Sequence, residues 1–450
     1  MAEIIKPAVD AENLNEAGDV ITEEIIITND RGQSVDIRAF CMSVVLYEDI
    51  FSNVLKGEAL ITDSGNLIAS VPFKGTEYLT IRYRTPSFKE VIGKTFYVYA
   101  VTDRAFTATD RQQGYVLHFM SVEGHIDNIT TISKKYSDTS DKIITSVYNE
   151  YLRPKRFINR DGFSQFNAST NLSSKVSVVP TYWSPLKLIN WVSSRSFKNG
   201  PEAPNFLFFE SNKGFYFTSV EELIRKQLDI DTLFAEYIYF PGAPTIQAEP
   251  NSKFKYTKPE TTKLFSMVRN VKPFKLYDTI HGQDHGYYAS TLLSVDPTLK
   301  RPISTDYDHY DVFKTFKHME PNNKQTYPNT LVRVPSTYKT LLTKQYKLHN
   351  DFEDPKYQKW ALQRNSLMHE LHEIKLEIEV PGRTDIEIGK LVRFLYPKNI
   401  DKTLDVLSED ALDPYMSGIY MITAIRHQFL LNKHVMYIEM VKDSFSRDLK

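Results

Sequence analysis

An internal repeat is the feature of this sequence that most constrains its fold. Two strand-like segments near the N-terminus match two near the C-terminus in residue type and spacing: Phe96–Val101 with Tyr420–Ile425, and Tyr115–Val122 with His434–Val441. Aromatic, β-branched and small residues fall at matching steps, as expected for half-buried strands. Unrelated antiparallel strand pairs also share such patterns, so the similarity could reflect ordinary strand composition rather than a repeat.

A third strand precedes each pair in the same order. Apolar residues alternate with their neighbours in both copies, at Leu79, Ile81 and Tyr83 in the first and at Val392, Phe394 and Tyr396 in the second. The order of three strands is therefore preserved. We predict two copies of one antiparallel barrel-like module in a single chain.

Composition favours a multidomain protein and excludes several classes of function. The chain has 450 residues, enough for about three domains, and 55 Lys and Arg against 56 Asp and Glu. No long run of one charge provides the clustered cations that nucleic-acid binding requires. With 27 Tyr, 27 Phe and only 17 Gly, the composition favours strands and large protein interfaces. We find no signal peptide and no apolar run long enough for a membrane span.

The chain has one cysteine, Cys41, which rules out a disulfide within the chain. A lone thiol fits folding in a reducing compartment, where it packs as a small buried hydrophobic residue. A reactive nucleophile is the alternative.

Changes in periodicity divide the chain into five predicted parts. They are an N-terminal arm at 1–19, a first β-barrel at 20–127, an α+β insert at 128–260, a β-rich and helical connecting domain at 261–372, and a second β-barrel at 373–450. Turn signals such as Asn29–Gly32 and Asp63–Asn66 separate the predicted strands of the first barrel. One of these strands is predicted over Val35–Tyr47.

The insert carries clear helix and hairpin signals. Apolar spacing predicts a helix over Ser140–Tyr151, and Ser184–Pro185 is a favourable helix start. The segments Asn205–Glu210 and Phe215–Thr218 flank a turn and predict a hairpin, followed by a capping box at Ser219–Glu222.

The connecting region is less regular. We expect a surface linker over Pro241–Glu260, strands over Lys263–Val271 and Tyr287–Asp296, an irregular surface segment over Pro302–Pro335, and a helix over Asp354–Leu371.

Two histidine clusters are the candidates for metal chemistry. His369 and His372 are three residues apart rather than four, and we expect solvent-facing residues at a helix end. The segment His281–Gly286 places two histidines and an aspartate, residue types that bind metal ions, on a tight loop. Such turns are also common where strands reverse. No Gly-x-Ser-x-Gly elbow or phosphate-binding glycine loop is present. We therefore predict no catalytic, cofactor-binding or metal-binding residues, and a protein that is not an enzyme.

Several segments in order resemble one protein family. They are Ser184–Trp191, Asn205–Glu210, Gly214–Phe217, Tyr287–Asp296, and Val380–Thr384 with Gly389–Lys390. Together they resemble the baseplate hub proteins of contractile-tailed bacteriophages, the T-even type and its relatives. The resemblance covers about Val20 to Val441.

The resemblance implies a mainly β fold in which two tail-tube-like antiparallel barrels flank inserted α+β domains. It also implies a structural homotrimer whose six barrels form a pseudo-sixfold ring between a hexameric tail tube and a trimeric central spike. The implied partners are the chain itself, the tail tube protein, the spike protein and baseplate wedge proteins, with DNA passing through the lumen without specific binding. Synthesis would occur in the host cytoplasm and the mature location would be the virion tail.

Alternatives from other classes remain at this point. They are a tail enzyme that degrades cell wall, suggested by the His281–His285 loop, and a tail module that binds host glycans. The hub of a related contractile injection system would use the same doubled barrel.

Overall fold

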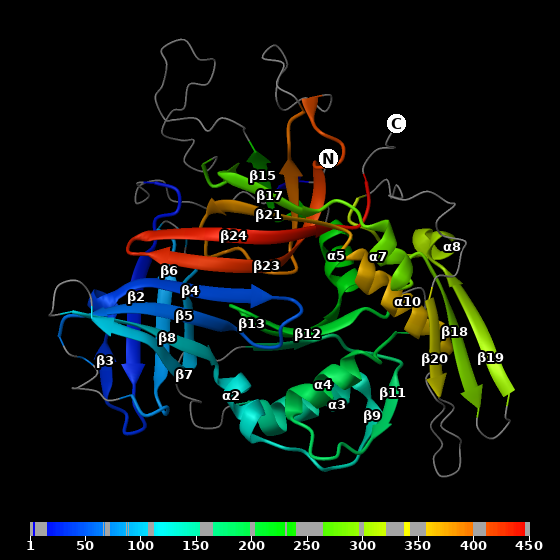
Figure 1. Ribbon diagram of the computed structural model, residues 1–450, viewed down its shortest axis with the longest axis horizontal. Helices are drawn as coiled ribbons and strands as arrows, with labels where there is room; N and C mark the ends of the chain where they lie inside the picture. The colour runs from blue at the N-terminus through cyan, green and yellow to red at the C-terminus, as the bar shows by residue number, and fades with distance from the viewer. Residues whose placement is uncertain are drawn as a thin grey trace.

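The computed structural model describes residues 3–4, 16–65, 67, 73–86, 88, 90–106, 112–153, 165–198, 203–229, 232–239, 264–296, 301–320, 337–342, 357–398 and 411–445, and the structural statements below concern these residues. The chain is mainly β. Its largest sheet has 14 strands and forms two barrel-like halves, each around its own hydrophobic core (Figure 1).

The first half lies entirely in the predicted first barrel. Its strands are β2 (Ile21–Thr28), β3 (Ser34–Asp36), β4 (Cys41–Asp49), β5 (Lys56–Asp63), β6 (Tyr78–Arg84), β7 (Ile92–Phe106) and β8 (Gln113–Ser121). One expectation was wrong: the strand predicted over Val35–Tyr47 is two strands, β3 and β4, separated by a 3-10 turn at Arg38–Phe40. The turn forms because the Asp36 carboxylate accepts a hydrogen bond from the Arg38 amide, and Ile37 is buried there.

The second half draws strands from three regions of the sequence. They are β15 (Ala235–Tyr239), β16 (Met267–Val268), β17 (Asn270–Lys275), β21 (Ile374–Pro381), β22 (Leu391–Leu395), β23 (Gly418–Leu430) and β24 (Lys433–Lys442). β15 pairs in parallel with β22, and β17 pairs antiparallel with β21. The sheet of this half therefore includes strands outside residues 373–450.

The internal repeat is present in the strand order. β4–β5–β8–β7–β6 are neighbours in the first half, and β17–β21–β24–β23–β22 are neighbours in the second, all antiparallel. The repeat thus covers five strands, whereas the sequence indicated three. It ends at the sixth strand, because β2 is antiparallel to β6 while β15 is parallel to β22.

Register confirms part of the sequence alignment and corrects another part. Leu79 lies opposite Phe96 just as Val392 lies opposite Tyr420. The equivalent strands β7 and β23 have a bulge at the same step, after Val98 and after Ile422. The match of Tyr115–Val122 with His434–Val441, however, is two residues out of register, since Phe119 faces Val98 where Met440 faces Ile422. A shift of two residues keeps every side chain on the same face, so alternation cannot detect it.

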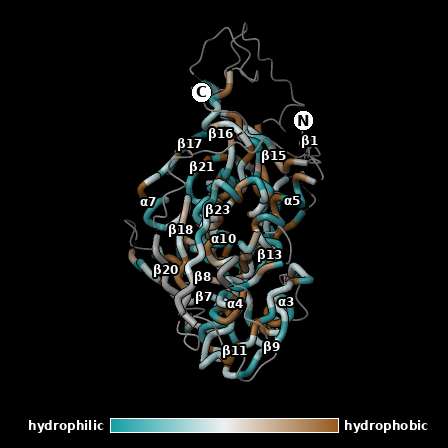
Figure 2. The backbone as a smooth tube through the Cα atoms, turned by 90° about the vertical axis from the view of Figure 1, so that its right-hand side faces the viewer, coloured by the Kyte–Doolittle hydropathy of each residue, from teal (hydrophilic) through white to brown (hydrophobic). Residues whose placement is uncertain are grey.

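The insert follows β8, and its helices α3 (Ser140–Val147) and α4 (Pro185–Ser193) lie toward one end of the molecule (Figure 2). Its elements are α2 (Val122–Ile129), β9 (Tyr136–Thr139), α3 (Ser140–Val147), a π-helical turn (Tyr148–Leu152), β10 (Gln165–Ala168), β11 (Lys175–Val178), α4 (Pro185–Ser193), β12 (Phe206–Ser211), β13 (Gly214–Ser219), α5 (Val220–Asp229) and β14 (Thr232–Leu233). The predicted caps are confirmed, because Ser184 accepts a hydrogen bond from the Lys187 amide and Ser219 from the Glu222 amide. The hairpin β12–β13 is confirmed as well.

A smaller unit joins β17 to β21. It contains α7 (Thr279–Asp284), β18 (Ala289–Asp296), β19 (Arg301–Asp308), α8 (His309–Val312), a 3-10 turn (Phe313–Thr315), β20 (Thr337–Leu342) and α10 (Tyr357–Glu370). The predicted strand over Tyr287–Asp296 and the helix over Asp354–Leu371 are confirmed. The irregular segment predicted from Pro302 is wrong at its start, because β19 pairs with β18 along its whole length.

Other expectations concern the termini and linkers. The predicted linker Pro241–Glu260 lies outside the described residues. Of the N-terminal arm, β1 (Glu3–Ile4) pairs with β14, and Asp19 binds the Lys433 ammonium group at 2.7 Å. Within the described part of the chain, no helix is long and apolar enough to cross a membrane.

Candidate functional site

The two halves share one continuous antiparallel sheet in the order β17–β21–β24–β23–β4–β5–β8–β7 (Figure 1). One side of this sheet packs on the two hydrophobic cores, and alternate side chains on the other side are half-buried or exposed. We call this second side the open face. Both copies of the repeat build this extended surface together, and it is therefore the candidate functional surface.

Charges on the open face nearly balance. The cations are Lys56, Lys272, Lys275, Lys375, Arg426 and Lys433, and the carboxylates are Asp49, Glu58, Glu377, Glu379 and Glu439. Lys375 forms an ion pair with Glu439 at 2.6 Å. The Arg426 guanidinium lies 3.9 Å from the centre of the Tyr437 ring. A polyanion passing over this face would displace few counterions, because the cations are already neutralised or interspersed with carboxylates.

The seam is the ladder between β23 and β4, where the two halves join. It runs in unbroken register from Ala424 opposite Asp49 to Leu430 opposite Ser43. Phe429 of β23 packs in the core of the first half, against Tyr83 at a ring separation of 4.5 Å. Backbone pairing and a shared core therefore fix the two halves to each other.

A buried polar network lies behind the seam. The Glu48 carboxylate is 2.7 Å from Nε2 of His427 and accepts a hydrogen bond from the Asn212 amide at 2.9 Å. Nδ1 of His427 lies 3.0 Å from Nε2 of His434. Burial and the neighbouring His427 lower the pKa of His434, so this ring stays neutral and can accept a hydrogen bond. The network connects both halves and the insert, whose β12–β13 turn carries Asn212.

A buried ion pair fixes the insert to the first half. The Lys94 ammonium of β7 contacts the Glu210 carboxylate of β12, and both side chains are at most 5% exposed. The same carboxylate accepts hydrogen bonds from Ser121 at 2.5 Å and from the Leu55 amide at 2.8 Å. Burial and the charge of Glu210 raise the pKa of the adjacent Glu123 to about 7.

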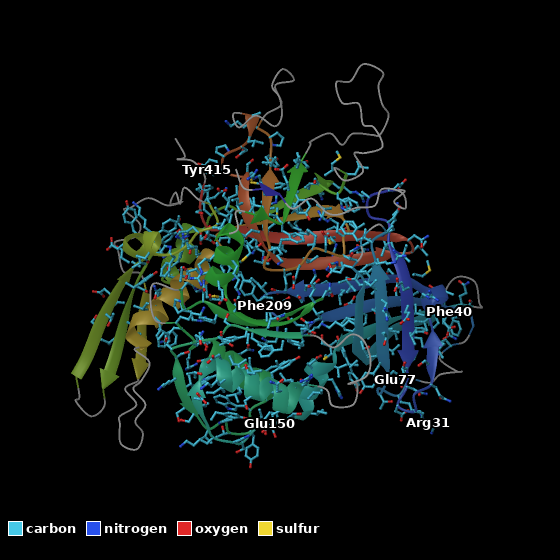
Figure 3. All side chains as sticks on the ribbon, turned by 180° about the vertical axis from the view of Figure 1, so that it is seen from behind. Arg31, Phe40, Glu77, Glu150, Phe209 and Tyr415 are labelled. Carbon is cyan, nitrogen blue, oxygen red and sulfur yellow. The ribbon has the colours of Figure 1, made fainter. Side chains whose placement is uncertain are left out.

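Apolar packing fixes the insert to the second half. Phe209, on the same strand as Glu210, is 1% exposed and belongs to the core of the second half. Figure 3 shows it near the middle of the molecule, between the helices of the insert and the large sheet. Adjacent residues of β12 thus bind different halves, since alternation points them in opposite directions.

The histidine candidates lie together, but on the surface. His281 is on α7, a short helix rather than the predicted strand-reversal turn, and His285 is its C-cap residue. Their ring centres are 4.0 Å apart. His369 of α10 lies 5.3 Å from His285. Among the described residues, no three His, Cys, Asp or Glu side chains are arranged to hold a metal ion. His372 is exposed as predicted, but Glu370 is buried, which corrects the expectation that this helix end faces solvent.

Glu370 takes part in a second buried polar cluster. Nδ1 of His318 lies 3.1 Å from the Asp443 carboxylate and 3.7 Å from that of Glu370. Burial opposes the charged ring, but Asp443 and Glu370 outweigh it and raise the pKa of His318 to about 9. The cluster connects the smaller unit to Asp443, the residue that directly follows β24.

His318 should make stability depend on pH. Because its pKa is raised in the folded state, its contribution is complete below about pH 6.5 and is lost as the pH rises through about 9. We expect His318→Gln to lower the free energy of unfolding by on the order of 2–3 kcal/mol at pH 6, and by much less at pH 10. Urea unfolding of both proteins across this range measures the difference. The exposed His285→Gln is the control, and a difference that stays constant with pH would refute the assignment.

Cys41 is half-buried in β4, as expected for a structural thiol. Its Sγ lies 3.6 Å from the Ser43 carbonyl oxygen, and burial raises its pKa to about 12. The thiolate is scarce at neutral pH, which disfavours the nucleophile alternative.

Comparison with solved structures shows which proteins share this fold. A tail protein from Neisseria meningitidis aligns with a TM-score of 0.52 at 8% identity, covering 93% of this chain and 96% of that one. The 43 kDa tail protein of prophage MuSo2 from Shewanella oneidensis aligns with a TM-score of 0.53 at 9% identity, covering 94% and 99%. Both alignments run over nearly the full length of each chain. The chain therefore shares its fold with these two tail proteins.

Sequence comparison adds nothing to this structural likeness. No protein-family model matches the chain. No curated protein matches it in sequence either.

Sequence reasoning did not find the residues that hold the parts together. Glu48, Lys94 and Glu210 look like ordinary strand charges. Lys94 and Glu210 are 116 positions apart, and Glu48 is 379 positions from His427. One signal was present in the sequence: Glu48 and Glu210 occupy positions where the alternation of their strands calls for apolar side chains. Such interruptions of a strand pattern indicate buried polar networks.

Proposed function

We propose that this chain is the structural hub of a phage contractile tail. Three copies would form a ring of six similar barrels that joins the hexameric tail tube to the trimeric central spike. The observation that carries the proposal is the duplication of a five-strand module within one chain. A chain with two equivalent modules lets a threefold assembly present six similar docking surfaces. The fold shared with two tail proteins, one of them from a prophage, supports the same conclusion.

In the proposed ring the open face lines the central passage. Its interspersed charges suit a wall along which DNA moves without specific binding. The tube protein would dock on the six repeated strand modules. The spike, which is threefold, and the wedge proteins would contact the insert and the smaller unit, which occur once per chain. The mature protein would then be part of the virion tail.

The mass of the purified chain in solution tests this proposal. Light scattering should give a trimer, and negative-stain images of that species should show six lobes around a central hole. Concentration-independent monomers in the presence of the cognate tube and spike proteins would overturn the proposal. Hydrolysis of purified cell wall by the wild-type chain would instead favour a tail enzyme.

A further inference from the structure

The continuous sheet ends in two edges that lack a strand partner among the described residues. On one side of β7, pairing with β6 ends at Tyr97, and the Val98 amide makes a last hydrogen bond to Glu77. Among the described strands, β8 is the one that residues 99–106 pair with, and we call these residues the β7 edge. At the opposite end of the sheet β17 pairs only with β21 within the described chain. We call residues 270–277 the β17 edge.

The internal repeat relates these two edges to the seam. β7 is equivalent to β23, and β17 is equivalent to β4, since each occupies the same place in the five-strand order. The strands β23 and β4 pair with each other within the chain. The β7 and β17 edges are therefore the second copy of the seam, with its two strands at opposite ends of the continuous sheet of one molecule (Figure 1).

The register of this second seam follows from the ladders of the first. The ladders within each half match residues of the β7 edge to their equivalents in β23, and residues of the β17 edge to their equivalents in β4. Applying the β23–β4 pairs to these equivalents gives Ala100 opposite Tyr277, Val101 opposite Leu276, Thr102 opposite Lys275, Ala105 opposite Lys272 and Phe106 opposite Val271. β7 has an extra residue between Thr102 and Ala105, and β17 has one between Pro273 and Lys275. The two extra residues offset each other, and the ladder between the edges is unbroken from end to end.

Side chains at the two edges also indicate a missing partner. Val101 and Phe106 on the β7 edge are 37% and 71% exposed, and Leu276 and Tyr277 on the β17 edge are 40% and 76% exposed. Exposed apolar residues on an unpaired strand favour association with another chain. Pro273 and the lysines of β17 disfavour unspecific pairing. A specific register is thus needed to cover this edge.

We propose that the β7 edge of one copy pairs antiparallel with the β17 edge of the next copy, in the register given above. The inference rests on the proposed homotrimer and names the surface that closes it. Each contact between chains then repeats the seam within a chain, and the open face continues around the ring.

Disulfide trapping tests the pairing and its register. In a Cys41→Ala background, Ala105→Cys with Lys272→Cys places two thiols directly opposite each other across the interface. Ala105→Cys with Asn270→Cys shifts one thiol by two residues, to about 7–8 Å away, which is too far for a disulfide. We expect covalent dimers and trimers on oxidation of the first protein, at least tenfold more than of the second.

The outcomes separate the pairing from the proposed function. Oligomers of the correct mass that give no disulfide, or give equal yields in both proteins, would overturn the pairing and leave the homotrimer standing. Monomers in every protein, with the tube and spike proteins added, would overturn both.

A charge exchange provides a second readout that preserves the fold. Both Val101 and Leu276 are partly exposed, so charges there are tolerated in a single chain. Val101→Lys with Leu276→Lys places like charges opposite each other and should weaken association roughly tenfold. Val101→Lys with Leu276→Glu should restore it. Equal association of the two variants, measured by light scattering, would contradict the register.

Discussion

Ile422→Asp is expected to unfold the second half of the sheet and to abolish oligomer formation. Ile422 is fully buried in β23, opposite Met440, within the core of that half. An aspartate there would be buried among apolar side chains, which costs several kcal/mol, a large part of the stability of a typical domain. Thermal unfolding followed by circular dichroism, and light scattering of the same sample, measure the two effects.

The matched control is Leu430→Asp on the same strand. Leu430 is 42% exposed and lies on the open face, so the new charge stays hydrated and we expect a change below about 1 kcal/mol. If Ile422→Asp assembled like the wild type, the placement of β23 at the centre of this core would be wrong.

Lys94→Met is expected to destabilise the junction between the first half and the insert by about 3–5 kcal/mol. The substitution leaves the Glu210 carboxylate buried without its cation, although the hydrogen bonds from Ser121 and Leu55 remain. Urea unfolding at pH 7 measures the loss. The control is Lys213→Met, which removes a partly exposed ion pair to Glu90 and should cost less than about 1 kcal/mol.

A second substitution distinguishes lost charge pairing from lost packing. Adding Glu210→Gln to Lys94→Met removes the unpaired charge and keeps the shape of the side chain. We expect the double variant to recover most of the stability that the single variant loses. A double variant as unstable as Lys94→Met alone would show that the ion pair does not stabilise this junction.

Much of the fold could be predicted because its strand and helix signals are local. Alternation marked β6, β7 and β8 and their equivalents, and capping residues marked α4 and α5 within a residue of their observed starts. The register of β7 against β8 could not be predicted, because a shift of two residues preserves the pattern. Two strands of the repeat, β4 and β5 with their equivalents β17 and β21, were not detected as equivalent in the sequence. Side chains of different size occupy their equivalent positions, so residue type does not reveal the match. Gly57 faces the large Phe119 in one half where Leu376 faces Met440 in the other.

The candidate surface was beyond sequence reasoning for a different reason. The seam joins residues 43–49 to 424–430, nearly the whole chain apart, and no local pattern indicates such a contact. The same holds for β15 and β17, which appeared to belong to other domains.

The break of the repeat at its sixth strand has a consequence for any ring built from this chain. In a ring of three copies the five shared strands would present one pattern six times around the axis, so a partner touching only them would have sixfold surroundings. Beside each first-half module runs an antiparallel β2, and beside each second-half module a parallel β15. A partner that reaches those flanking strands meets two alternating environments. One polypeptide would thus offer sixfold contacts to one neighbour and threefold contacts to another without changing its conformation.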